Sequence, residues 1–423
     1  MFSQTAIVLS IFIVTYIFII SEKIDRTIIS FFGATMLILL GILSQEEALH
    51  FIDFNTIGLL IGMMIIVNVL KTTGVFQYIA IKTAKLAKGD PWRIIMFLCI
   101  VTAVLSAFLD NVTTVLLIAP VTLVITETLE VNPLPFLVPQ IISSNVGGTG
   151  TLVGDPPNIM IGSISGLGFM DFILNTGPIA LVILIVTIFI FKFIYGRKVT
   201  VDEAQKKKLL MFDEQKAIKE KRLLIKSLSV LFLTIIGFSL HEMLGLESAS
   251  VALIGASTML LLTRADIEVV LHEIEWPTIF FFAFLFMLVG GLEKVGLIDM
   301  LAERITETAE TNFFLTALLM LWGSAIISSF LDNIPFVATM IPLISKMSVM
   351  TSIDVTPLWW ALSLGACLGG NGTLIGASAN VIVAGILEKN KYKLSFIDYI
   401  KVGFPMMIIS IIMASVYLIA FYL

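Results

Sequence analysis

Charged residues and reactive side chains are scarce in this sequence. Only 13% of the 423 residues are Asp, Glu, Lys or Arg, whereas 58% are hydrophobic. Soluble domains carry about 25% charged residues, so this composition excludes an ordinary soluble protein and indicates helices that span a membrane. The chain has three histidines and two cysteines, and both Cys99 and Cys367 lie in apolar runs. We therefore expect no disulfide and no zinc site, and the lack of a basic patch argues against a nucleic-acid partner.

Long apolar runs fill most of the chain, and each intact run approaches the ~17–25 residues that a transmembrane helix needs. The first run has no basic residue ahead of it and no small-residue cleavage site behind it, so we interpret it as a retained helix. The predicted spans of the first half are 5–20, 27–43, 56–70, an interrupted run at 135–164, and 177–195. Those of the second half are 227–241, 249–263, 278–292, an interrupted run at 358–387, and 402–422.

The chain contains two copies of one sequence pattern. The tetrapeptide FLDN occurs at Phe108–Asn111 and again at Phe330–Asn333, 222 residues later. The same offset relates Gly74 to Gly296 and aligns two glycine-rich stretches, which indicates an internal repeat. We predict a first repeat at residues 1–195, a charged cytoplasmic linker at 196–226 and a second repeat at 227–423.

Five crossings per repeat is an odd number, so the second repeat must insert with the opposite orientation. Inverted-topology repeats are typical of secondary transporters. The distribution of Lys and Arg agrees, because the predicted outside loops at 44–55, 163–176 and 242–248 contain neither residue. Only Lys294, Arg304 and Lys346 fall on the opposite side from this assignment, beside the second hairpin. We therefore predict an all-α, multi-pass protein of the cytoplasmic (inner) membrane, with both termini outside. Trp359 and Trp360 are predicted to lie at the membrane interface.

Each repeat also contains a predicted helical hairpin, at residues 92–129 and 312–349, with an Asp-Asn pair at its tip. An ionisable group at membrane depth costs at least ~2.5–3.5 kcal/mol and usually faces a cavity or a partner. Asp110 and Asp332 are therefore candidate functional residues, although an aspartate can also serve as a helix N-cap. The sequence leaves open whether the hairpins are re-entrant or cross the membrane fully.

The interrupted spans carry the second signal. Residues 143–158 include four glycines and two prolines, and residues 369–380 form the matching stretch. Neither composition supports a continuous helix. Unwound backbone at membrane depth occurs only where protein or a water-filled cavity surrounds it, and its carbonyl groups and half-helix ends bind ions. The alternative is that the glycines only permit close helix packing.

These two signals define the candidate ion- or substrate-binding residues. They are Asp110, Asn111, Thr113, Thr114, Asn145, Gly147, Gly148, Thr149, Thr151, Asp155, Asn158, Asp332, Asn333, Gly369, Gly370, Asn371, Thr373 and Asn380. Bound Na⁺ is expected at Asp110, Asn111, Asp332 and Asn333, and no other cofactor is expected. The first half-site is the more polar one, because Asp155 corresponds to Ala377 in the second repeat.

The segments FLDNVTTVLLIAPV (108–121) and SSNVGGTGTLVGDPPNIMIGS (143–163) resemble those of a known family. The chain is similar to the arsenite permease and sodium–proton antiporter (ArsB/NhaD) group of the ion transporter superfamily, and most similar to its P-permease (pink-eyed dilution) branch. The resemblance implies a homodimer with a scaffold and a moving transport domain. Related sodium–carboxylate symporters carry Ser-Asn-Thr at each hairpin tip, where this chain has Asp110–Val112 and Asp332–Ile334. The aspartates favour a cation or a proton.

These observations predict a secondary active ion transporter rather than an enzyme. We expect elevator-like alternating access, coupled to sodium or protons, with a small inorganic ion or small anion as substrate. Export of arsenite or another anion, sodium-coupled uptake of an anion or carboxylate, and a passive channel are the alternatives. An intramembrane aspartyl protease is disfavoured because Leu152–Asp155 lacks the first glycine of the G-x-G-D motif. The sequence does not identify the transported species, the coupling ion or its stoichiometry.

Overall fold

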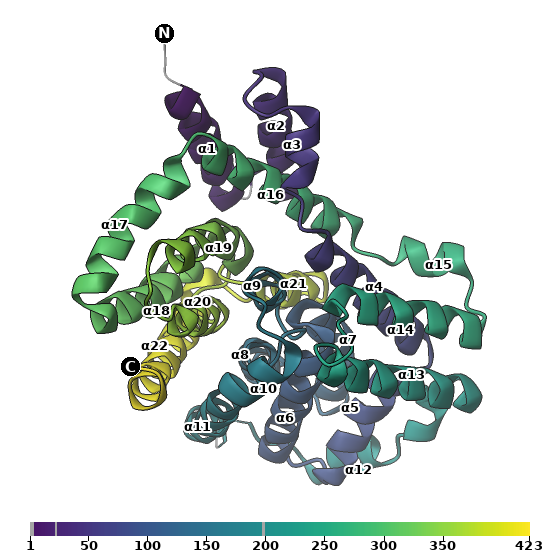
Figure 1. The fold of residues 1–423 in the computed structure, drawn as a ribbon. Helices are drawn as coiled ribbons and strands as arrows, with labels where there is room; N and C mark the ends of the chain where they lie inside the picture. Colours follow the sequence, from purple (N-terminus) through teal and green to yellow (C-terminus); the bar gives the residue numbers. More distant parts are fainter. Residues whose placement is uncertain (1–3, 22, 197–198) are drawn as a thin grey trace.

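The computed structural model describes all residues except 1–3, 22 and 197–198, and the described residues form helices without a β-strand (Figure 1). The first half contains α1 (Gln4–Ser21), α2 (Arg26–Leu39), α3 (Gln45–His50), α4 (Phe54–Thr72), α5 (Val75–Leu86), α6 (Pro91–Leu109), α7 (Asn111–Thr128), α8 (Leu134–Thr149), α9 (Pro156–Ser165), α10 (Phe169–Asn175) and α11 (Gly177–Tyr195). The linker contains α12 (Glu203–Leu210) and the 3₁₀ helix η1 (Glu214–Ala217). The second half contains α13 (Lys221–Leu240), α14 (Ser248–Thr263), α15 (Ile267–His272), α16 (Trp276–Lys294), α17 (Leu297–Thr311), α18 (Phe313–Phe330), α19 (Asn333–Met350), α20 (Thr356–Gly369), α21 (Ser378–Lys389) and α22 (Phe396–Phe421).

Ten of the helices in the described part of the chain are long and apolar enough to cross a membrane. They are α1, α4, α6, α7, α11, α13, α16, α18, α19 and α22, so both arms of each predicted hairpin pass this test. The shorter apolar helices α2 and α14 correspond to predicted spans as well. The protein is therefore an all-α, multi-pass membrane protein, as the sequence predicts.

The sequence repeat extends to the helix boundaries. Adding 222 to the bounds of α3, α4 and α7 gives the bounds of α15, α16 and α19. Gly74 and Gly296 immediately precede α5 and α17 and have φ angles of +81° and +76°, a left-handed conformation that favours glycine at both matched positions. Most helices of the first repeat therefore have a counterpart in the second. The inverted orientation of the second repeat stays a prediction.

Two helices of the second half, α13 and α22, begin more than one helical turn earlier than predicted. α13 begins at Lys221, inside the predicted linker, because its first turn carries charged residues that extend an apolar helix into the polar region. α22 begins at Phe396 and joins into one helix what α10 and α11 form separately in the first half. In the first half, α9 and α10 meet at a bend of 117°.

The two halves pack against each other reciprocally. α4 packs against α14, and the matching helices α16 and α2 form the equivalent pair. α7 contacts α21, while its counterpart α19 contacts α9. Each hairpin therefore lies beside the broken span of the opposite half, and Figure 1 shows α9 and α21 near the middle of the molecule.

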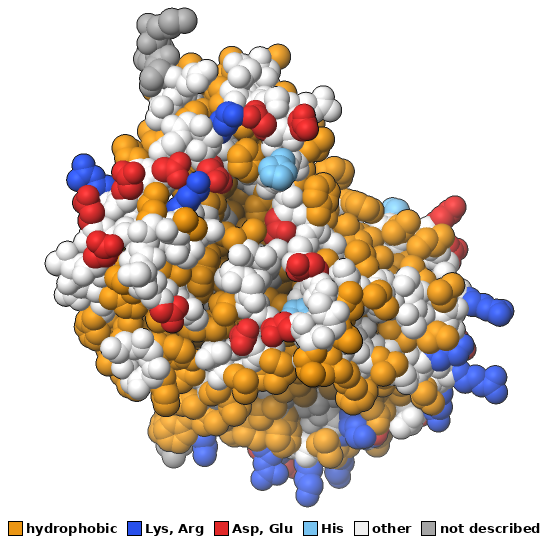
Figure 2. Space-filling view, viewed as in Figure 1, with side chains coloured by type: hydrophobic (Ala, Val, Ile, Leu, Met, Phe, Trp, Pro, Cys, Tyr) orange, Lys and Arg blue, Asp and Glu red, His pale blue; other side chains and the backbone are white. Residues whose placement is uncertain are grey.

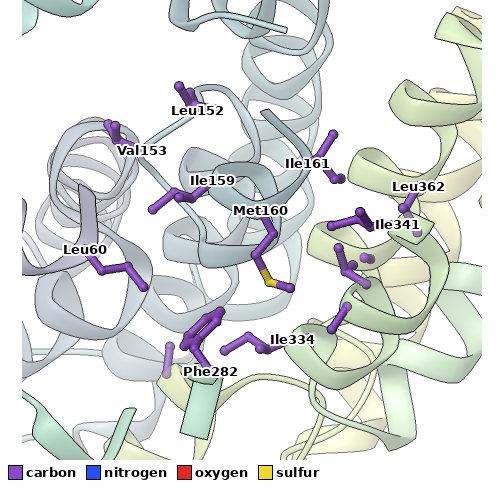
Figure 3. Packing of buried hydrophobic residues seen from close by; sticks show 14 of the residues in the cluster. Leu60, Leu152, Val153, Ile159, Met160, Ile161, Phe282, Ile334, Ile341 and Leu362 are labelled. Carbon is purple, nitrogen blue, oxygen red and sulfur yellow. The ribbon is translucent and has the colours of Figure 1, made fainter. Parts of the chain in front are cut away.

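The half-helix α9 lies in the hydrophobic core. Ile159, Met160 and Ile161 are all at most 3% exposed. Figure 3 shows Met160 extending between Phe282 of α16 and Ile334 of α19. Because the N-terminal part of this helix, from Pro156 to Ile161, is buried, its polar end groups must find partners inside the protein.

The surface outside the core is largely apolar. Figure 2 shows hydrophobic side chains over much of one face, with Lys and Arg gathered along the lower edge and at the right. Trp359 and Trp360 are only 5% and 2% exposed, so their prediction as interface anchors is wrong. They lie on α20, which packs against α8, α18, α19 and α22 and so buries its aromatic side chains.

Candidate functional site

The first hairpin tip is a single residue with strained backbone. α6 ends at Leu109 and α7 begins at Asn111, and Asp110 between them has φ +79° and ψ 157°. This conformation is essentially restricted to glycine and costs a residue with a side chain about 1–3 kcal/mol. The carboxylate of Asp110 accepts hydrogen bonds from the backbone N–H of Thr113 at 2.8 Å and from its hydroxyl at 2.7 Å. Asp110 is therefore the N-cap of α7. Its strained backbone conformation allows the capping carboxylate to lie directly at the tip of the first hairpin.

The second hairpin tip has a different environment. Asp332 has φ −43°, and its carboxylate forms an ion pair with Arg26 and accepts a hydrogen bond from the Ser378 hydroxyl at 2.7 Å. Arg26 also donates to the Ser378 hydroxyl at 2.8 Å. Arg26 was not among the candidate site residues. It begins α2 and connects this helix to the tip of α19 and the start of α21.

Hydroxyl groups attach each broken span to its own hairpin. Thr151 donates to the carbonyl of Ala107, and the matching Thr373 donates to the carbonyl of Ser329. Ser106 donates to the carbonyl of Ser144 at 2.7 Å, and the matching Ser328 donates to the carbonyl of Ala366 at the same distance. Hairpin and broken span therefore form one unit in each half.

Two matched asparagines bind the carbonyl groups of the unwound segments. Asn158 Nδ2 donates to the carbonyls of Gly148, Thr149 and Thr151 at 3.4, 3.3 and 2.9 Å. Asn380 Nδ2 donates to the carbonyls of Gly370 and Thr373 at 2.8 and 2.9 Å. These side chains satisfy backbone groups that a continuous helix would have paired internally.

A network of buried amides crosses between the halves. Asn111 Nδ2 donates to Asn145 Oδ1 at 3.3 Å, and Asn145 Nδ2 donates to Oδ1 of Asn371 and of Asn380 at 2.9 and 3.0 Å. Asn371 is fully buried and its Nδ2 group has no hydrogen-bond partner. A buried, unpaired N–H group costs about 1–3 kcal/mol, so this donor suits an acceptor atom that enters the site.

On the other side of the network, Asn158 Oδ1 accepts from the Ser363 hydroxyl at 2.7 Å and from Cys367 Sγ at 3.4 Å. Cys367 occupies the position in the second repeat that Asn145 occupies in the first. Both residues contact the matched asparagine of the opposite half. Sequence reasoning did not select Ser363 as a site residue, because a lone serine in an apolar run carries no distinctive signal.

Asp155 is 1% exposed and lies within reach of the opposite hairpin. Asn333 Nδ2 donates to its two carboxylate oxygens at 3.2 and 3.4 Å. Asp110 and Asp332 are its electrostatic neighbours, and Glu275 is an electrostatic neighbour of Asp110. In the described part of the chain, neither Asp110 nor Asp155 forms an ion pair with a basic residue. The first half-site therefore contains two acidic groups without a compensating charge.

The glycines of the breaks lie where backbone segments approach closely. A Cβ atom on Gly147 would collide with the backbone of Ala103, and one on Gly369 would collide with the backbone of Ala325. A Cβ on Gly148 would lie 2.5 Å from the carbonyl oxygen of Gly154. These positions require glycine for packing, which is the alternative that the sequence left open. The hydroxyl groups of Thr114 and Thr149 donate to the backbone carbonyls of Asp110 and Asn145, so both are paired within their own helices.

Arg26 and Ser378 are the main residues that sequence reasoning missed. One signal was available: an arginine at the first position of a helix is unfavourable beside the positive end of the helix dipole, unless an acid compensates it. The residue matching Arg26 in the second repeat is the neutral Ser248. A basic residue present in one repeat alone, at the start of an apolar run, indicates a specific partner.

The sequence matches the family model CitMHS, described as citrate transporter, over residues 16–365. It is 41% identical to an uncharacterized transporter of Mycobacterium tuberculosis over 98% of both chains. It is 34% identical to the P protein of Homo sapiens, over 98% of this chain and 60% of that protein. Among solved structures, the fold is similar to that of the YdaH transporter of Alcanivorax borkumensis, with a TM-score of 0.63 and 12% identity over 99% of this chain and 98% of that one. It is also similar to MtrF of Neisseria gonorrhoeae, with a TM-score of 0.60 and 12% identity over 92% and 84% of the two chains.

The buried polar centre between two interrupted helices, together with these similarities, defines a membrane transporter rather than an enzyme. The chain belongs to the CitMHS citrate transporter family. The resemblance to the group that includes the P protein is confirmed.

Proposed function

We propose that this protein is a secondary active ion transporter that works by alternating access and is coupled to sodium or protons. The observation that carries this proposal is the uneven charge of the two half-sites. Asp332 is neutralised by Arg26, whereas Asp110 and Asp155 have no basic partner in the described residues. Carboxylates at membrane depth without a counter-charge are costly, and a bound cation or proton removes that cost.

The first half-site offers oxygen ligands to such a cation. The carboxylates of Asp110 and Asp155 are hard donors, and the unwound stretch between α8 and α9 adds backbone carbonyls. Interrupted helices in secondary transporters bind Na⁺ or H⁺ in this manner. The half-helix α9 begins with Pro156 and presents its N-terminal end nearby, which would favour an anionic group of the substrate.

The arrangement of the helices into two groups supports alternating access. α1–α4 and α13–α16 form reciprocal pairs across the halves, while hydroxyl groups join each hairpin to its broken span. We infer that the first set is the scaffold and that hairpins and broken spans move together in an elevator-like step. The family resemblance implies a homodimer, and Lys and Arg placement favours insertion in the cytoplasmic membrane with the linker inside.

The transported substrate is proposed only as a class. The family description favours a small carboxylate such as citrate, and export of arsenite or another small anion is the second candidate. The unpaired Asn371 Nδ2 group would donate to an oxygen of either substrate. A passive channel is disfavoured because the centre is fully buried and hydrogen-bonded across the halves.

The test is transport by the purified protein in proteoliposomes. An imposed pH gradient and, separately, an imposed sodium gradient should drive uptake or release of one member of a panel of citrate, arsenite, phosphate and lithium. Gradient-driven accumulation above equilibrium establishes a secondary carrier. Single-channel currents in planar bilayers, or flux that stops at equal concentrations under both gradients, would contradict the proposal.

A further inference from the structure

The second hairpin tip carries a positive charge that the first tip lacks. Arg26 forms an ion pair with Asp332, and the exposed fractions of the two side chains are 27% and 13%. The residue that corresponds to Arg26 in the other repeat is Ser248, which has no charge. Both tips carry the sequence Phe-Leu-Asp-Asn.

The guanidinium group of Arg26 lies where oxygen atoms converge. It donates to the Asp332 carboxylate and to the Ser378 hydroxyl, and Ser378 in turn donates to Asp332. Carboxylate and hydroxyl oxygens are ligands that hard cations also prefer. The guanidinium therefore occupies a site that a small metal cation could take.

The scaffold side holds Arg26 in place. Its guanidinium carbon lies 4.8 Å from the centre of the Phe281 ring of α16, a distance at which a cation is attracted to the aromatic face. Tyr16 of α1 donates to the carbonyl of Pro335 at 2.8 Å, so a second contact joins this part of the scaffold to the same hairpin. Arg26 belongs to α2, while its two oxygen partners come from the hairpin and the broken span.

The surrounding space is large enough for an ion with water. A cavity of about 310 Å³ is lined by Asp25, Arg26, Asp332 and Ser378, with apolar side chains such as Ile19 and Phe330 completing its wall. Glu275 is a further acidic group whose charge interacts with that of Arg26. Without the guanidinium, the polar side chains that line this cavity would all be acidic or neutral.

We propose that Arg26 is a resident counter-cation. In the second half-site its guanidinium group takes the place that an exchangeable cation takes in the first half-site. This inference deepens the proposed function and rests on it. A charge that is fixed to the chain does not leave with the substrate. The transporter therefore has one exchangeable cation site per chain, although two matching repeats would otherwise provide two such sites. Replacement of Arg26 by the serine of the other repeat should open a latent cation site formed by Asp332 and Ser378.

The test compares sodium binding to the purified full-length protein and three variants by equilibrium dialysis with radioactive sodium. Arg26→Ser should bind one more sodium ion per chain than the wild type, whatever number the wild type binds. Arg26→Lys should show no increase, because an ammonium group retains the positive charge. The double variant Arg26→Ser/Asp332→Asn should also return to the wild-type number, because it lacks the carboxylate ligand. Lys23→Gln is the matched control, since it removes an exposed positive charge three residues away and should change nothing.

Thermal unfolding in sodium chloride and in choline chloride provides the second measurement. Sodium should raise the Tm of Arg26→Ser more than that of the double variant, since it replaces the lost partner of Asp332. An Arg26→Ser protein with the wild-type sodium number, or with equal Tm values in the two salts, overturns the inference. Failure to recover that variant folded even in sodium overturns it as well. Absence of sodium binding by the wild type concerns the proposed coupling ion alone, because the inference predicts a difference between variants.

Discussion

Asn333, at the tip of the second hairpin, donates hydrogen bonds to both carboxylate oxygens of Asp155 in the first broken span, at 3.2 and 3.4 Å. The two residues are 178 positions apart. Through this contact the second hairpin contributes directly to the first half-site. The polar centre is therefore one composite site, and a change at one tip should affect the acid of the opposite half.

Loss of the Asn333 amide should destabilise the protein through Asp155. Asn333→Ala leaves the buried carboxylate without its donor, whereas the same change in an Asp155→Asn background removes no charged hydrogen bond. The two substitutions should therefore be non-additive, with an interaction energy of about 0.5–3 kcal/mol in the free energy of unfolding. Unfolding in detergent monitors all four proteins of the cycle. Additive effects would show that the hydrogen bonds between Asn333 and Asp155 do not contribute to stability. Asn390→Ala, at an exposed position, serves as the control.

Gly148 should tolerate no side chain. A Cβ atom there would lie 2.5 Å from the carbonyl oxygen of Gly154, within the unwound stretch itself. Gly148→Ala should reduce the free energy of unfolding by about 1–3 kcal/mol, and Gly148→Leu should abolish transport. Gly323→Ala, in α18, is the matched control because a Cβ atom at this position has open space around it. Wild-type stability of Gly148→Ala would disprove the close approach.

The predicted inverted orientation of the repeats leads to an expected labelling pattern. In a background without Cys99 and Cys367, single cysteines at Glu46 and Glu247 should react with an impermeant maleimide from outside the cell. A cysteine at Lys207 of the linker should react only after the membrane is opened. The prediction follows from the distribution of Lys and Arg, since cytoplasmic loops are enriched in both. Labelling of positions 46 and 207 from the same side would exclude the inverted arrangement.

The sequence predicted the elements of this fold well because its repeat and its apolar runs are local patterns. The predicted span at 56–70 became α4, and the first glycine-rich stretch contains the break between Thr149 and Pro156. Both features depend on residues that are adjacent along the chain. Helix ends shifted where charged residues continue an apolar helix, as at Lys221.

Local sequence patterns could not predict the contacts between the two halves. Arg26 and Asp332 are 306 positions apart, and nothing near either residue in sequence indicates the other. Trp359 was assigned to the membrane interface because tryptophan is enriched there, yet it is buried by helices from both halves. Most of the candidate residues lie together at the centre of the structure, but the hydrogen-bond partners of each one follow only from the three-dimensional packing.

A pH-dependent ion pair should stabilise the contact between α3 and α16. Lys294 of α16 hydrogen-bonds to Glu47 and lowers the pKa of Glu47 from 4.5 to about 2. A lowered folded-state pKa stabilises the protein above pH ~4.5, and this contribution is lost as the pH falls through about 2. Glu47→Gln should therefore lower the Tm slightly at pH 7, and the difference from the wild type should shrink as the medium is acidified. Glu46→Gln is the control, and a constant difference at all pH values would contradict the assignment.

The acids of the two hairpin tips should differ in their roles, although they occupy matched positions. Asp110 has no basic partner and adopts a strained backbone conformation, whereas Asp332 is paired with Arg26. A carboxylate that is exposed in turn to desolvation and to a bound cation can exchange a proton for that cation. Asp110→Asn should therefore remove coupling to the pH gradient more completely than Asp332→Asn does, and Asp155→Asn should weaken cation affinity at least tenfold. The measurement is transport in proteoliposomes as a function of pH, with matched amounts of each folded variant. Because asparagine also caps helices well, Asp110→Asn preserves the cap while removing the charge. An unchanged pH profile in this variant would restrict Asp110 to its capping role and would disprove the proposed mechanism.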